Sequence, residues 1–398
     1  MTRRELLKLL SATPILLLNP PMIFGSEAAP HKQNKATAGR WNRTVVLIEL
    51  HGGNDGLNTV IPYTNSTYYD LRPRLAIPRD QIFQLSQTLG LHPALEPFMS
   101  MWDAKELAIV NGVGYPNPNR SHFRSIEIWE TGSNSHEFLD AGWLTRVFEQ
   151  HPPPSAFTAE AILLGRGDAG PVSGGNTRAI ALQNPQYFLK QSQQVRPVTT
   201  TTANQALAHV LKIQRDISRT ADDLYVRLQK VPGVPNTHPN SKIGKQLQIA
   251  AQLLTARVPA PVIKITHGSF DTHAGQLNQH QRLLKELAEG LAAFRTTMIQ
   301  QGLWDEIVVM TYSEFGRRVA ENGSQGTDHG TAAPHFLLGG QVKGGLYGQM
   351  PSLTDLQNGD LRFSVDYRSL YTSLVQSWWG LPSDTLDGRK YPVIDCLS

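Results

Sequence analysis

The chain has 398 residues, of which 40% are hydrophobic, so it is long enough to bury a large core. Its formal net charge is +4, and removal of the first 28 residues, which carry three positive and two negative side chains, leaves +3. So small a charge argues against nucleic acid as a partner. The single cysteine, Cys396, excludes an intramolecular disulfide and argues against a thiolate metal site. Any metal must therefore be held by His, Asp and Glu side chains.

The N-terminal segment predicts export. Arg3 and Arg4 precede an apolar run that ends near Phe24, which is typical of a twin-arginine signal. We interpret residues 1–28 as this removable signal rather than as a membrane anchor, because prolines interrupt the run and a spanning helix needs roughly 20 apolar residues. No later segment is long and apolar enough to span a bilayer. We expect a periplasmic or otherwise exported protein without a stable membrane span, with residues 29–43 as a linker.

Strands alternate with helices from residue 44 onward. The first strand, Thr44–Leu50, is almost continuously apolar, as in a parallel sheet that is covered on both faces. Further strands are predicted at Leu107–Asn111, Ala161–Leu164, Pro261–Thr266, Glu306–Thr311 and His335–Leu338. Helices are predicted at Pro93–Ala104, Asn204–Val231, Ser241–Val258, Leu277–Gln301 and Asp366–Trp379. This order indicates an α/β sandwich over residues 44–398, with a helical insertion at about 181–258.

Acidic and imidazole side chains recur just after the predicted strands, where an α/β sheet presents ligands. Asp55 follows the first strand in a glycine-rich segment and could reach a metal, although Asn54-Asp55-Gly56 is also a common turn sequence. Asp271 and His273 are one residue apart, so in an extended segment both side chains point the same way and could ligate one ion. The alternative is an Asp that orients a surface His or caps the next helix.

Glu314 and the pair Asp328-His329 flank a glycine-containing loop between two predicted strands. Taken separately, Glu314 could cap a helix and Asp328-His329 could be a hydrogen-bonded loop pair. Their recurrence near successive strand ends favours a shared site. Arg317 and Arg318 could bind phosphate or sulfate, although such a pair is more often a solvated helix face.

Ser121 is the best candidate for a nucleophile. Arg120 and Arg124 flank it and could bind an anion, and an adjacent metal could activate its hydroxyl. Ser121 also precedes a helical pattern and could be its N-cap, and both roles are compatible in one residue.

A set of motifs covers nearly the whole chain. Besides the twin-arginine pattern, it comprises HGGNDGLNTVIP from His51, NRSHFRSIEIWETG from Asn119, FDTHAGQ from Phe270, YSEFGRRVAENGSQGTDHG from Tyr312 and DYRSLYTSLVQSWWG from Asp366. In this order the motifs resemble the bacterial exported family known as domain of unknown function 1501, which belongs with the alkaline phosphatase and sulfatase superfamily. The resemblance implies a central mixed, mostly parallel sheet between helices.

The resemblance also implies a site with an Asp after the first strand, a nucleophilic hydroxyl, and later Asp and His residues that hold two metal ions. Asp55 then resembles the first-strand ligand and Ser121 the nucleophile. Asp271 and His273 resemble the later ligands, although the superfamily commonly spaces these further apart.

The remaining ligands can be aligned in two ways. Superfamily members often place an Asp-His pair directly after a strand, where this chain has Ser313-Glu314. Either Asp328 and His329 are the pair and His335 is the final histidine, or Glu314 replaces the pair and His329 is the final histidine. The run from His329 into the next strand favours the second alignment, in which the ligand set is altered.

The sequence therefore predicts an alkaline phosphatase-like or sulfatase-like hydrolase of small anionic phosphate or sulfate esters. One or two divalent ions, zinc, manganese, magnesium or calcium, would activate Ser121. The altered ligand set supports an alternative, a non-catalytic envelope or polysaccharide-associated binding protein that retains the fold. A metal-free serine hydrolase is a further alternative, although Ser121 lacks the Gly-x-Ser-x-Gly elbow.

Overall fold

The computed structural model describes residues 39–165, 169–182, 184–185, 188, 204–231, 234, 237–382, 384 and 386–398. The predicted export signal and the first part of the predicted linker lie outside these residues, as does most of the stretch 183–203. Within the described chain, no helix combines the length and the apolar character needed to cross a membrane.

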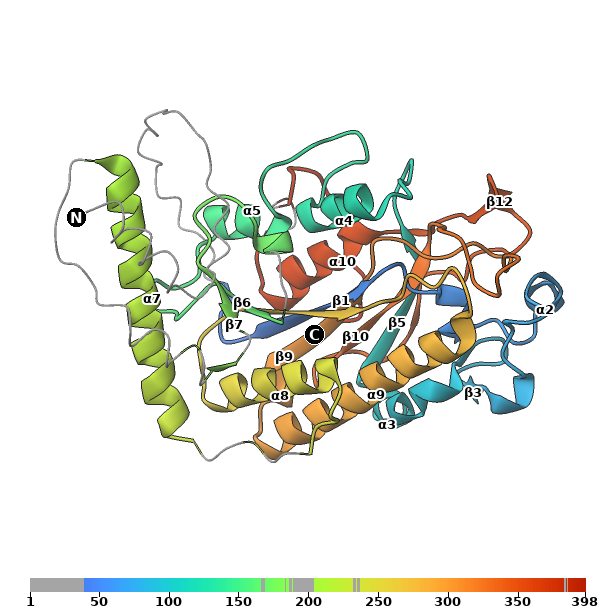
Figure 1. Cartoon of the computed structure of the whole chain (residues 1–398), viewed down its shortest axis with the longest axis horizontal. Helices are drawn as coiled ribbons and strands as arrows, with labels where there is room; N and C mark the ends of the chain where they lie inside the picture. The colour runs from blue at the N-terminus through green and yellow to red at the C-terminus, as the bar shows by residue number, and fades with distance from the viewer. Residues whose placement is uncertain are drawn as a thin grey trace.

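A mixed sheet of nine strands forms the centre of the described chain (Figure 1). Its order is β11 (Gly345–Tyr347), β5 (Leu107–Gly114), β10 (Ala333–Leu338), β9 (Ile307–Tyr312), β1 (Thr44–His51), β8 (Val262–Gly268), β6 (Ala161–Leu164) and β7 (Ala179–Leu182), with β14 (Val365–Asp366) paired to β5. β10 is antiparallel to both of its neighbours, and the other pairings in this sheet are parallel. The architecture confirms the predicted α/β class with a mostly parallel sheet.

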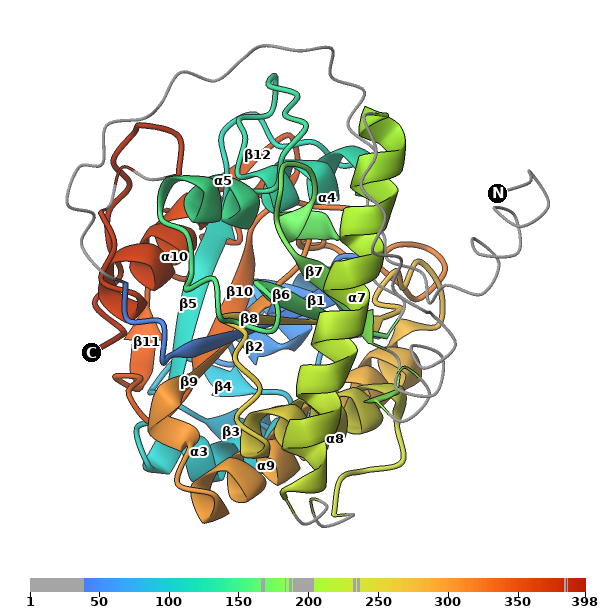
Figure 2. The same ribbon diagram turned by 90° about the vertical axis from the view of Figure 1, so that its left-hand side faces the viewer.

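Helices cover both faces of the sheet because β1 is apolar on both sides. Val45 and Leu47 pack toward α4 (His122–Thr131), α5 (Trp143–Gln150) and α10 (Tyr367–Ser373). Val46 and Ile48 point the other way, toward α3 (Met99–Asp103), α8 (Lys242–Thr255) and α9 (Gln276–Gln300) (Figure 1). α7 (Gln205–Gln229) stands at the β7 end of the sheet (Figure 2).

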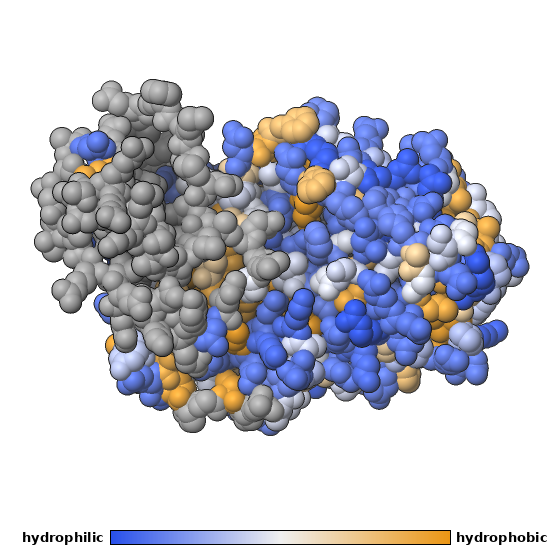
Figure 3. Space-filling view, in the orientation of Figure 1, coloured by the Kyte–Doolittle hydropathy of each residue, from blue (hydrophilic) through white to orange (hydrophobic). Residues whose placement is uncertain are grey.

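Short elements complete the described fold. β2 (Val60–Ile61), β4 (Gly90–Leu91) and β3 (Phe83–Gln84) form a small antiparallel sheet, with α2 (Ser66–Leu71) between β2 and β3 in the chain. β12 (Leu356–Gln357) pairs with β13 (Asp360–Leu361). Figure 3 shows that the described part of one face is mainly hydrophilic, with small separate apolar areas.

Several boundaries differ from the sequence-based expectation. The predicted helix Pro93–Ala104 is a 3-10 helix over Pro93–Phe98, with Pro97 inside it, followed by α3. The predicted insertion at about 181–258 begins inside β7, whose last residues are Ala181 and Leu182. α8, which was assigned to this insertion, buries Ile243 and Leu247 in the core beside the sheet, so it is a covering helix.

His335 is buried in β10 away from solvent. Its ring packs edge-on against Trp129, with ring centroids 5.1 Å apart. Neither ring nitrogen has a hydrogen-bond partner among the described residues, and burial lowers the pKa of His335 to about 3. An imidazole in this setting stays neutral and acts as a core side chain.

Replacement of His335 by leucine is expected to stabilise the protein, and more so at acidic pH. An unfolded imidazole titrates near pH 6.5, whereas the folded one titrates near 3. Between these values only the unfolded chain binds the proton, so stability falls by up to about 1.4 kcal/mol per pH unit as the pH drops. Urea unfolding at pH 8 and pH 5 measures the free energy of unfolding. We expect this free energy to fall less between pH 8 and pH 5 in His335→Leu than in the wild type. An equal loss in both proteins, with the exposed His136→Ala as control, would contradict this account.

Candidate functional site

The loops that follow four of the parallel strands come together at one edge of the described sheet. β1 pairs in parallel with β8 and β9, with His51 opposite Gly268 and Glu49 opposite Tyr312. β5 also runs parallel to β9, because β10 between them is antiparallel to both. The loops after β1, β5, β8 and β9 therefore meet at this carboxyl edge, where ligands bind in α/β sheets.

Gly52 allows the loops after β1 and β8 to touch. Its φ is +111°, and a Cβ atom at this position would overlap the backbone nitrogen of Asp271. Phe270 N donates to His51 O (2.8 Å) at the same crossing. Only glycine fits both the backbone conformation and the space, so the HGG sequence fixes the position of Asp271.

A cluster of one carboxylate and three imidazoles lies at this edge. Asp271 Oδ1 is 3.0 Å from His273 Nε2 and 3.3 Å from His329 Nε2, and Asp271 Oδ2 is 3.4 Å from His122 Nε2. The Nε2 atoms of His273 and His329 are only 2.8 Å apart. His122, Asp271 and His329 each offer one ligand atom within 4.8 Å of the others, which suits a shared metal ion. We call these four residues the His-Asp cluster.

The outer nitrogen of each imidazole faces an oxygen. His122 Nδ1 contacts Glu314 Oε1 (2.7 Å), and His329 Nδ1 contacts the backbone carbonyl oxygen of Arg120 (2.8 Å). His273 Nδ1 lies 3.6 Å from Asp328 Oδ1. Because a carbonyl oxygen can only accept, His329 Nδ1 donates to it, and Nε2 is the ring nitrogen that faces Asp271 and His273. Oxygen partners of this kind are what orient metal-binding histidines.

Glu314 is fully buried behind His122. Its Oε1 also accepts from Gly52 N (2.9 Å), and its Oε2 lies 3.3 Å from Ser313 Oγ. Glu314 therefore contacts the His-Asp cluster through His122, and its carboxylate orients this imidazole.

Arg317 forms an ion pair with Asp271. Its Nη2 lies 2.7 Å from Asp271 Oδ1, and its guanidinium is buried rather than solvated as in a surface pair. Burial alone would raise the pKa of Asp271, but the hydrogen bond and charge of Arg317, with His122 and His273, lower it to about 2. Asp271 is thus ionised throughout the neutral range.

Asp55 lies in a separate buried ion pair. Its Oδ2 accepts from Arg72 Nη1 (2.7 Å) and from Gln276, and both charged side chains are inaccessible to solvent. Burial would raise the pKa of Asp55, but the charge and hydrogen bond of Arg72 hold it below the usual range. Arg72 already supplies the positive charge that a metal would bring to this carboxylate.

Ser121 and its neighbouring arginines are placed differently. Ser121 is exposed at the start of α4, and its side chain makes no capping hydrogen bond, so its hydroxyl is not used by the helix. Arg120 pairs with Asp360 (3.2 Å) beside the cluster. Arg124 turns away, with its guanidinium 2.8 Å from Glu127 and 3.8 Å from the ring centre of Phe138.

The other predicted ligands lie at different depths. Asp328 is exposed on the rim, where Asn322 donates to it (3.1 Å) and lowers its pKa. A short ribbon, with Arg317 bridged to His329, carries His329 back into the cluster. His335 faces Trp129 in the core, and the structure does not bring it to the His-Asp cluster.

His122 is the member of the cluster that was not among the predicted ligands. As a neighbour of Ser121 it had no evident geometry in the sequence. The missing information is the strand order, because β5 must run parallel to β9 for the loop after β5 to reach this edge.

Solved structures with a similar fold are distant. They include the lipoteichoic acid synthase LtaP from Listeria monocytogenes (11% identity, TM-score 0.36, covering 81% of this chain and 74% of that one). They also include the C-terminal periplasmic domain of EcEptC from Escherichia coli (9%, TM-score 0.39, covering 87% and 84%). A protein in the alkaline phosphatase superfamily from Vibrio parahaemolyticus shows 11% identity and a TM-score of 0.33, covering 88% and 72%. Similarity this low says nothing about chemistry.

No curated protein matches the sequence. A family match, in contrast, spans residues 42–388, which is most of the chain, and confirms the resemblance that the sequence motifs indicated. The chain belongs to the family described as Protein of unknown function (DUF1501).

Proposed function

We propose that this protein is an exported metal-dependent hydrolase of phosphate or sulfate esters, with the His-Asp cluster as its metal site. The observation that carries the proposal is the convergence of His122, Asp271 and His329, from three separate segments of the chain, with ligand atoms within 4.8 Å of one another. The paired Arg3 and Arg4 before an apolar run support export.

The residues present fit one divalent cation. The outer nitrogens of His122 and His329 are held by Glu314 and by a backbone carbonyl, which leaves their Nε2 atoms directed at Asp271. His122 Nε2 is buried without a hydrogen-bond partner among the described residues, as expected of a nitrogen meant for an ion. Imidazole and carboxylate ligands suit zinc or manganese better than calcium, which takes oxygen ligands.

Ser121 is the proposed nucleophile. It lies between Arg120, whose carbonyl orients His329, and His122 of the cluster, so its backbone is fixed on both sides. Its hydroxyl is exposed and free of capping, and the positive end of the α4 dipole favours an anionic ester there. A bound cation would favour deprotonation of a nearby hydroxyl and offset charge on the transferred group. Arg120 is the proposed anion contact, because the Arg124 guanidinium is held by Glu127 and Phe138.

The purified protein is expected to hold about one divalent ion per chain. His329→Ala and His122→Ala should remove a direct ligand and abolish stoichiometric binding. Glu314→Gln should weaken binding by about 10–100-fold, because it perturbs only the orientation of His122. Metal analysis and calorimetric titration of zinc or manganese measure both effects.

His136→Ala is the matched control for these variants, since His136 is exposed and outside the cluster. Wild-type affinity in His329→Ala, with the fold intact by circular dichroism, would refute the metal site.

Ser121→Ala separates binding from chemistry. The variant should keep the full metal content of the wild type, because no ligand atom is removed. Because the nucleophile is removed, turnover of aryl phosphate or aryl sulfate should fall by at least about a thousandfold. Steady-state kinetics on the two esters, with metal analysis of the same sample, provide the measurement. Full activity in Ser121→Ala would show that water or another side chain is the nucleophile.

The Asp55–Arg72 pair supports a second candidate, a non-catalytic binding protein that retains the fold. Asp55 was predicted as a metal ligand after the first strand. Its buried carboxylate is instead paired with the positive charge of Arg72, which makes it a poor partner for an additional ion. A protein that binds metal and anions but cleaves no ester in a broad panel would favour this candidate. Turnover that disappears on chelation and returns with added metal would exclude it.

A further inference from the structure

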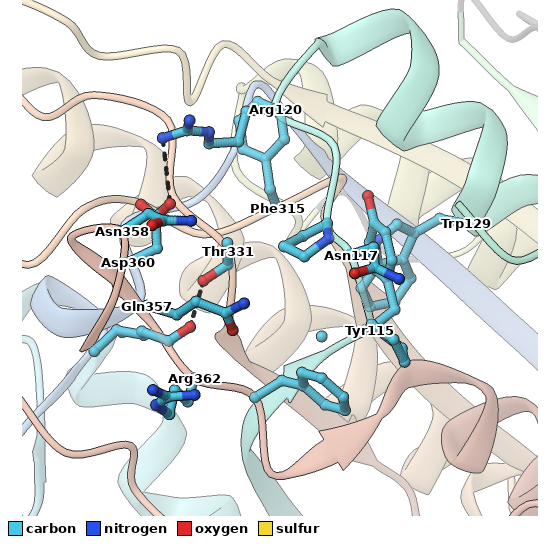
Figure 4. Close-up of a pocket in the computed structure, with 15 residues that line it drawn as sticks. Tyr115, Asn117, Arg120, Trp129, Phe315, Thr331, Gln357, Asn358, Asp360 and Arg362 are labelled. Carbon is cyan, nitrogen blue, oxygen red and sulfur yellow. Dashed lines mark hydrogen bonds and ion pairs between the residues drawn. The ribbon is translucent and has the colours of Figure 1, made fainter. Parts of the chain in front are cut away.

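A pocket of about 460 Å³ opens between the loop after β5 and the β12–β13 pair (Figure 4). This volume lies in the range of small-molecule sites, roughly 300–1,000 Å³. Its lining includes four aromatic residues, of which the first three are largely buried: Tyr115, Trp129, Phe315 and Phe363. The amide side chains of Asn117 and Gln357 lie on opposite sides of it in Figure 4.

The pocket shares a wall with the His-Asp cluster. The ring of Phe315, which lines the pocket, is centred 4.9 Å from that of His122 and 4.6 Å from that of His329. Arg120 also lines the pocket, and its backbone carbonyl accepts from His329 Nδ1 (2.8 Å). A group bound in the pocket would therefore be adjacent to an ester held at the cluster.

The cations in the pocket wall are already paired. Arg120 Nη1 lies 3.2 Å from Asp360 Oδ2, and Arg362 Nε lies 2.9 Å from Asp355 Oδ1. Among the described residues, no lysine lines the pocket. Each arginine of the wall thus already has a carboxylate beside it, which favours a neutral polar group over a second anion.

The remaining wall chemistry suits a ring that carries hydroxyl groups. Phe363, the aromatic residue most exposed at the pocket (38%), offers an apolar surface for ring C–H groups. Exposed Asn117 and Gln357 can each both donate to and accept from hydroxyls.

We propose that this pocket binds a neutral sugar or cyclitol ring as the alcohol part of the substrate, while the attached phosphate or sulfate lies at the His-Asp cluster. The proposal rests on the proposed function for the identity of the reaction. Recognition of the ring itself requires no metal, because none of the four cluster residues lines the pocket.

The test measures ring binding without turnover. The purified protein is titrated calorimetrically with N-acetylglucosamine, galactose and myo-inositol, each with and without chelator. We expect at least one probe to bind, unchanged by chelator, and Phe363→Ala and Gln357→Ala each to weaken it by about tenfold. Tyr225→Ala is the control, because Tyr225 is an aromatic residue of comparable exposure (44%) on α7, at the far end of the molecule from β12 (Figure 1).

The outcomes separate this proposal from the catalytic one. Absence of binding by all three probes would overturn it, and so would equal binding by the wild type and both pocket variants. Binding of 4-nitrophenol in place of the three ring probes would also overturn it, since the pocket would then select aromatic groups. Ring binding by a protein that holds no metal and cleaves no ester would uphold the pocket while rejecting the catalytic proposal.

Discussion

The buried guanidinium of Arg317 is the interaction on which the site depends. It donates to backbone carbonyls of Gly52 and Gly53 after β1, Phe270 after β8 and Thr327 in the next loop, and it pairs with Asp271. One side chain thus donates hydrogen bonds to backbone carbonyl groups of three loops that lie beyond the ends of the strands. Removal of this cation would leave buried acceptors and a carboxylate without compensation, which is costly in a low-dielectric interior.

Arg317 also affects the chemistry of the cluster. By holding Asp271 Oδ1 it keeps this carboxylate ionised, and it directs Oδ2 toward His122. Arg72 plays a related part at Asp55, although there the pair is sealed from solvent. The protein therefore places two fixed cations beside two carboxylates at the sheet edge, and only the carboxylate of Asp271 remains accessible on one side.

Much of the fold follows from local sequence, since buried parallel strands are apolar and short. Ala161–Leu164 was predicted with the bounds that the structure has. Leu107–Gly114 was predicted too short, because Gly112 and Gly114 look like a turn, whereas pairing of Val113 with Val365 extends the strand. Asp271, His273 and His329 were recognisable because each follows or precedes a strand. The role of Arg72 was not, because its partner lies across a tertiary contact that no local pattern encodes.

The cluster joins segments that are far apart along the chain: α4 at His122, the loop after β8 at Asp271, and the ribbon before β10 at His329. An ion shared by them would act as a reversible cross-link that closes long loops in the folded chain only. Its binding free energy would then add to the free energy of unfolding. The same three side chains would thereby contribute to the stability of the folded chain, independently of any reaction at the site.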